Sequence, residues 1–113
     1  MNNNLFKNLI TRSPLADTNF EEQTTFWQDF CIAEYYGEKS IQETFNNIFK
    51  EWKNDIKFMT ELTLVLNYKE WKHHDNGNFK ISKLYHDLCV KVDNWCTSNF
   101  TGNDLQYFLK NTD

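Results

Sequence analysis

A chain of 113 residues with a net charge of −4 and an aromatic content of 17% has the size of one domain and enough large apolar side chains to fill a core. One proline and three glycines leave long stretches without helix breakers, which argues against a turn-rich β fold. Arg12 is the only arginine, and together with the negative charge this argues against direct binding of nucleic acid. We expect an all-α protein: a compact bundle of four long helices plus a short C-terminal helix.

Residues 1–18 are expected to form an N-terminal arm or short docking helix, ahead of a single helical domain over residues 19–113. The N-terminal stretch lacks the continuous apolar run that an export signal needs. No apolar run in the sequence reaches the roughly 18 residues of a candidate transmembrane helix. These features predict a cytoplasmic protein that does not contact a membrane.

The five helices are expected in chain order at about residues 19–36, 40–53, 55–74, 79–99 and 101–110. Capping boxes at Thr18 and Ser40 mark the first two starts, because a Ser or Thr followed three residues later by Glu satisfies free backbone amides. Asn54 or Asp55 is the expected cap of the third helix. Gly37 ends the first helix, since glycine readily adopts the left-handed conformation found there.

The third helix carries two apolar stripes on different faces. Leu64, Tyr68 and Trp71, spaced i, i+4, i+7, form the second stripe, while Lys69 and Glu70 lie off it and are expected in solvent. Such a helix is either sandwiched between neighbours or exposes an aromatic patch. Because aromatic residues are favoured anchors of protein interfaces, these three residues are one candidate partner-binding surface.

A second candidate surface is the acidic first helix. The segment from Glu21 to Glu38 holds five acidic residues and no basic residue. Its candidate partner-binding residues are Glu21, Glu22 and Asp29. Acidic faces can occupy the basic groove of a target protein, so the segment is compatible with a protein partner.

The cysteines Cys31, Cys89 and Cys96 are expected to be reduced core residues. Cys89 and Cys96 lie two turns apart on one predicted helix, roughly 10 Å along its axis, which is beyond the reach of a disulfide. Cys31 is expected on the apolar side of the first helix, where apolar surroundings would make the thiol inert. Free thiols suit a cytoplasmic protein.

Metal and catalytic sites have few candidates. Glu70 and His73 show the Glu-x-x-His spacing of di-iron bundles, but the second copy that such a site needs is missing. Glu34 falls inside the apolar arc of the first helix, where a half-buried carboxylate either acts as a general base or, more often, finds a lysine or backbone partner. We therefore predict no catalytic residue, no metal and no cofactor. The alternative is a small helical-bundle enzyme or metal-binding protein that uses Glu34, or Glu70 with His73 and His74.

The segments "FWQDFCIAEYYG", "EWKNDIKFMTELTLVLNYKEW" and "LQYFLKNTD" resemble small uncharacterised helical proteins carried by phages and mobile elements of Bacteroidetes-type bacteria. The resemblance covers most of the chain and brings no functional residues with it. It is compatible with a non-enzymatic protein–protein interaction protein, a phage or mobile-element factor that binds a host protein and inhibits or redirects it. A second copy of the chain, giving a homodimer, is the other partner we expect.

Overall fold

The computed structural model describes residues 26–112, and within them every regular element is a helix. In chain order these are α3 (Trp27–Tyr36), α4 (Glu38–Trp52), α5 (Ile56–Asp75), α6 (Phe79–Asn99) and α7 (Gly102–Thr112). The expected all-α class is confirmed. The predicted arm over residues 1–18 and the predicted start of the first helix at Asn19 lie outside the described residues.

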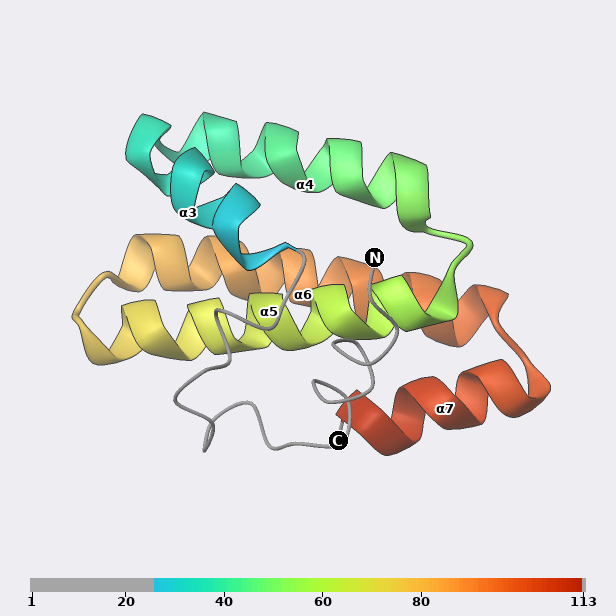
Figure 1. Cartoon of the computed structure of the whole chain (residues 1–113). Coiled ribbons are helices and arrows are strands. Elements are labelled where there is room, and N and C mark those ends of the chain that lie inside the picture. Colours follow the sequence, from blue (N-terminus) through green and yellow to red (C-terminus); the bar gives the residue numbers. More distant parts are fainter. Residues whose placement is uncertain (1–25, 113) are drawn as a thin grey trace.

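The helices α5 and α6 form an antiparallel hairpin at the centre of the molecule (Figure 1). The short α3 and the longer α4 pack against each other on one side of this hairpin, and α7 packs on α5 from another side. The connection between α3 and α4 is a single residue, Gly37, whose φ of 109° lies in the region that glycine adopts without strain. This junction and the α5–α6 turn lie at the same end of the bundle.

The core is centred on α5, whose residues 59–66 are all buried. Phe30 of α3 packs edge-on against Tyr85 of α6, with ring centroids 5.8 Å apart, and both side chains are fully buried. The third predicted helix is therefore sandwiched over its middle. None of the described helices is both long enough and apolar enough to span a membrane.

The helix starts were predicted with mixed success. Asp55 is the N-cap of α5, and its Oδ1 atom accepts hydrogen bonds from the backbone amides of Lys57 at 3.0 Å and Phe58 at 3.1 Å. The predicted cap at Ser40 is wrong, because α4 already begins at Glu38. The positive φ of Gly37 lets the chain turn directly after α3, and the Gly37 carbonyl accepts the amide of Ile41 at 3.1 Å.

The Asp55 cap gives a first testable prediction. Replacing Asp55 with alanine should lower the free energy of unfolding by about 1 kcal/mol, because the first turn of α5 loses the acceptor for two backbone amides. Urea unfolding followed by circular dichroism measures this loss. Asn54→Ala changes the exposed neighbour that is not the cap and should have little effect. Equal losses in the two variants would contradict the capping role.

Candidate functional site

A polar cluster lies where α3, α5 and α6 meet, and we call it the Glu34 cluster. It consists of Cys31 and Glu34 from α3, Lys69 and His73 from α5, and Tyr85 from α6. The Lys69 Nζ atom lies 3.1 Å from Glu34 Oε2 and donates to Cys31 Sγ at 3.2 Å. The Tyr85 hydroxyl donates to the same Glu34 oxygen at 2.5 Å, and His73 Nε2 lies 3.1 Å from it.

Helical spacing assembles this cluster from pairs. Cys31 and Glu34 are three residues apart on α3, and Lys69 and His73 are four residues apart on α5, so each pair shares one helical face. The faces meet because α3 packs on the α5–α6 hairpin. Lys69 is consequently buried, with 3% of its side chain exposed, and the prediction that it lies in solvent is wrong.

The charges of the cluster are compensated. The Lys69 ammonium also lies 3.9 Å from the centroid of the Trp27 ring, a cation–π contact. Burial alone would raise the pKa of the Glu34 carboxyl, but the Tyr85 hydrogen bond, the Lys69 charge and the His73 contact together lower it below its usual value. Burial first, and then the hydrogen bond and negative charge of Glu34, raise the pKa of Tyr85.

The hydrogen bonds of His73 are consistent with one tautomer. With the proton on Nε2, the ring donates to Glu34 and its Nδ1 atom accepts from Asn78 Nδ2 at 3.3 Å. The ring also stacks on Tyr85 with centroids 5.7 Å apart and planes at 15°. Glu34 Oε2 thus faces three donors and is not a free general base, and the half-buried carboxylate has the lysine partner expected of a structural glutamate.

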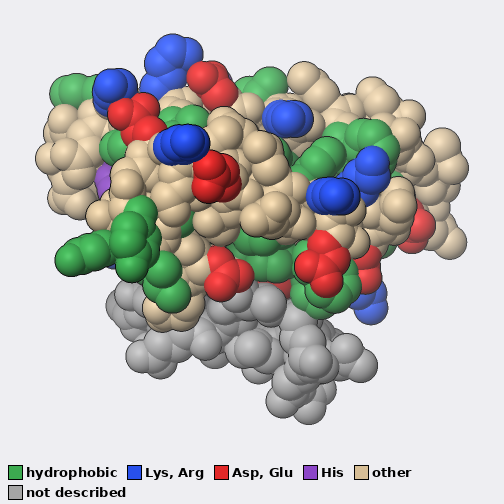
Figure 2. All heavy atoms as spheres, turned by 90° about the horizontal axis from the view of Figure 1, so that it is seen from above, with side chains coloured by type: hydrophobic (Ala, Val, Ile, Leu, Met, Phe, Trp, Pro, Cys, Tyr) green, Lys and Arg blue, Asp and Glu red, His purple; other side chains and the backbone are tan. Residues whose placement is uncertain are grey.

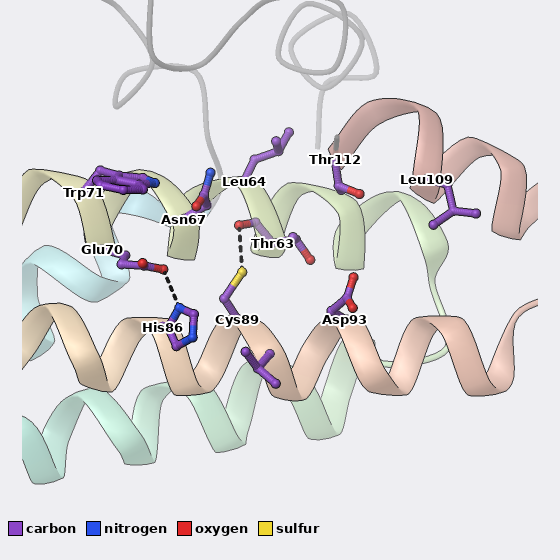
Figure 3. A pocket seen from close by; sticks show the side chains of 11 residues that line it. Thr63, Leu64, Asn67, Glu70, Trp71, His86, Cys89, Asp93, Leu109 and Thr112 are labelled. Carbon is purple, nitrogen blue, oxygen red and sulfur yellow. Dashed lines mark hydrogen bonds and ion pairs between the residues drawn. The ribbon is translucent and has the colours of Figure 1, made fainter.

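The second feature is a pocket of about 400 Å³ between α5, α6 and α7 (Figure 3). Glu70 and His86 contact each other on its wall, with Glu70 Oε1 3.2 Å from His86 Nδ1. Cys89 directs its thiol toward the Thr63 carbonyl at 3.9 Å. The pocket combines these groups with Trp71 and other apolar lining, but they form no recognisable catalytic arrangement.

The residues of the alternative metal-binding interpretation are not brought together. Glu70 pairs with His86, whereas His73 contacts Glu34 on another side of α5. His74 is exposed, 3.8 Å from the Asp75 carboxylate. Over residues 26–112, no group of three or more His, Cys, Asp or Glu side chains is placed to hold a metal ion.

The third feature is a set of exposed aromatic side chains at the end of the bundle that holds the α3–α4 junction and the α5–α6 turn. This aromatic end consists of Tyr35, Tyr36, Trp71 and Phe79, which are 85%, 74%, 46% and 63% exposed. The rings of Tyr35 and Tyr36 meet edge to face at 5.2 Å. Figure 2 shows hydrophobic side chains projecting from the surface on the side where Figure 1 places α3.

Three contacts are formed by residues of the aromatic end and their neighbours. The His74 ring lies between Trp71 and Phe79, with centroid distances of 5.6 Å and 5.2 Å. Next to Phe79, Lys80 forms an ion pair of 3.1 Å with Glu38, which follows the two tyrosines in the chain by two residues. The ends of α3 and α5 and the start of α6 therefore lie at the same end of the bundle.

The predicted partner-binding residues differ in how exposed they are. Leu64 is 7% exposed, and Tyr68 is half-buried with its ring 5.2 Å from Trp27, so Trp71 is the member of that stripe that reaches the surface. Asp29 is exposed on α3. Glu21 and Glu22 lie outside the described residues.

Sequence reasoning missed Tyr35, Tyr36 and Phe79 as surface residues. Tyr35 and Tyr36 end a helix just before a glycine, and Phe79 begins a helix just after a turn. Their position at helix ends was the sequence feature that could have indicated their exposure. No protein-family model, curated protein or solved structure matches the chain.

Proposed function

We propose that this chain is a non-enzymatic protein-binding protein and that the aromatic end is its docking surface. The observation that carries the proposal is the exposure of four large aromatic side chains, between 46% and 85%, at one end of the bundle. Tyrosine and tryptophan are the residues that interface hot spots favour, and a monomer rarely leaves a contiguous apolar surface without a use.

The surroundings of the aromatic end also suit an interface. Protein interfaces combine an aromatic centre with a polar rim. Here the exposed ion pair of Glu38 with Lys80 lies beside Phe79, and Lys83 pairs with Asp87 at 3.4 Å farther along α6. A partner with an apolar groove bordered by charged residues would fit this arrangement.

The biological setting is part of the same proposal. A phage or mobile-element factor that binds a host protein and modulates it would need a small, stable fold and one anchoring surface. The three free thiols of the chain suit the reducing cytoplasm as the compartment where this happens. The partner in this proposal is a protein of the host, and self-association is the competing outcome of the test.

The proposal predicts that the triple variant Tyr35→Ser, Tyr36→Ser, Phe79→Ser loses its partner and keeps its fold. The tagged full chain is incubated with lysate of its native host, and the retained proteins are identified by mass spectrometry. We expect a specific protein on the wild type that falls by at least about tenfold on the variant, which corresponds to hot-spot losses above 1.4 kcal/mol. Circular dichroism should show unchanged helicity, because the three side chains are exposed.

Val90→Ser is the matched control, because Val90 is 43% exposed on α6 about three turns from Phe79. This variant should retain the same partner as the wild type. Equal retention by the triple variant would overturn the assignment of the surface. Sedimentation of the wild type and the triple variant tests self-association. A wild-type dimer that the triple variant disrupts would show that the aromatic end binds a second copy of the chain.

A further inference from the structure

The three cysteines of the chain lie in different environments. Burial is the main cause that raises the pKa of both Cys89 and Cys96 to about 12, with a contribution from Asp93. Such thiols stay protonated and unreactive. Cys31 is partly exposed, and the Lys69 ammonium donates to its sulfur at 3.2 Å. Cys89 is also partly exposed, so the lysine contact is what distinguishes Cys31 from the other two cysteines.

The Lys69 nitrogen is held in place beside the sulfur. Its ion pair with Glu34 at 3.1 Å and its position 3.9 Å from the Trp27 ring restrict the side chain, of which 3% is exposed. Among the described cysteines, Cys31 is the one whose sulfur has a lysine nitrogen within hydrogen-bond distance. An oxidised sulfur at this position therefore lies within reach of the Lys69 nitrogen.

We propose that Cys31 and Lys69 form an oxidant-dependent covalent link, a sulfenamide, when the protein meets hydrogen peroxide. Peroxide first converts the Cys31 thiol to a sulfenic acid and releases one water molecule. The Lys69 ammonium loses one proton to solvent, and the neutral amine attacks the sulfur. The S–N bond forms and the S–O bond breaks. The leaving hydroxide takes the proton that the attacking nitrogen loses and becomes the second water molecule. Sulfur is oxidised by two electrons and peroxide is reduced by two.

The link would join α3 to α5 across 38 positions of the chain. It would also remove the positive charge of Lys69 from Glu34. Sulfenic acids condense with nearby thiols or nitrogen atoms, and thiols reverse such products, so the link is a reversible modification and not damage. It protects Cys31 from irreversible oxidation to the sulfinic acid.

The test treats the full chain with hydrogen peroxide, digests it without reductant and analyses the peptides by mass spectrometry. We expect a cross-linked pair containing Cys31 and Lys69, lighter by two hydrogen atoms than the sum of its two peptides and absent after dithiothreitol. Cys89→Ser should give the same product, and Cys31→Ser should give none. Lys69→Arg keeps a positive charge beside Glu34 but lacks the amine, so Cys31 should stop at the sulfenic acid and react with dimedone.

Three results would overturn the proposal. Oxidation of Cys89 or Cys96 ahead of Cys31 would contradict the assigned reactivity. Direct conversion of Cys31 to the sulfinic acid in the wild type, without a linked peptide, would show that Lys69 does not trap the sulfur. Linked peptides of Cys31 with several other lysines would show that the pairing is not specific. Because the wild-type product is identified directly, the test stands even where a variant fails to fold.

Discussion

Replacing Lys69 with methionine is expected to lower the free energy of unfolding by about 3 kcal/mol. The change removes the ammonium from Glu34 and leaves a half-buried carboxylate with fewer partners. Breaking a buried ion pair by removing one member costs about 3–5 kcal/mol, and the lower end applies here because Glu34 is 22% exposed and keeps Tyr85 and His73. A domain of this size has only about 5–15 kcal/mol of stability in total.

Chemical unfolding at neutral pH measures this loss, and Lys72→Met is the matched control. Lys72 also lies near the Trp27 ring, at 5.3 Å from its centroid, but is exposed on α5. Lys72→Met should therefore change the free energy of unfolding by less than about 0.5 kcal/mol. The double variant Lys69→Met, Glu34→Gln should recover part of the loss, because no carboxylate is then left unpaired. A double variant less stable than the single one would contradict the ion-pair explanation.

Acid dependence gives a second check of the same pair. The pKa of Glu34 is lower in the folded state than in the unfolded chain. Ionised Glu34 therefore stabilises the fold above the pKa of an unfolded glutamate, about 4.3. This stabilisation is lost as the pH falls through the pKa of Glu34 in the folded state. Lys69→Met removes one cause of this lowered pKa, so the difference in stability between wild type and variant should shrink as the pH is lowered below about 4.

Much of the fold could be predicted from the sequence because helix signals are local. The range of α6 was predicted to the residue, and the Asp55 cap was named as one of two choices, because both depend on neighbours within a few positions. The Ser40 cap failed because the geometry of Gly37 determines where α4 starts. Local signals predicted the helices, and the conformation of Gly37 moved the start of α4 from Ser40 to Glu38.

The candidate sites were less predictable because they depend on which helices touch. The letters Lys-Glu-Trp-Lys occur twice, yet Trp52 packs on Phe58 at 4.2 Å between centroids while Trp71 is 46% exposed. Lys69 and Glu34 are 35 positions apart, and the sequence around either residue does not indicate that they form a pair. The position of Glu34 inside an apolar arc did indicate that its carboxylate needs a partner. A lysine or backbone partner was therefore expected, but the sequence did not indicate which lysine.

Raising the pH from about 8 to about 10 is expected to lower the free energy of unfolding by an amount on the order of 2–4 kcal/mol. The cause is two thiols on α6, those of the partly exposed Cys89 and the buried Cys96, whose pKa values desolvation raises to about 12. In the unfolded chain a cysteine titrates near 8.5. The folded value is the higher one, so this stability is fully present below about 8.5 and is lost as the pH rises toward 12.

Urea unfolding at several pH values, followed by circular dichroism, measures this slope. Cys89→Ala and Cys96→Ala should each flatten it, because each removes one thiol that ionises only in the unfolded chain, whatever the variant does to stability at pH 8. Tyr85→Phe is the matched control: the pKa of Tyr85 is also raised, but an unfolded tyrosine titrates near 10, so its effect begins above this window. An unchanged slope in both cysteine variants would show that other groups destabilise the fold at alkaline pH.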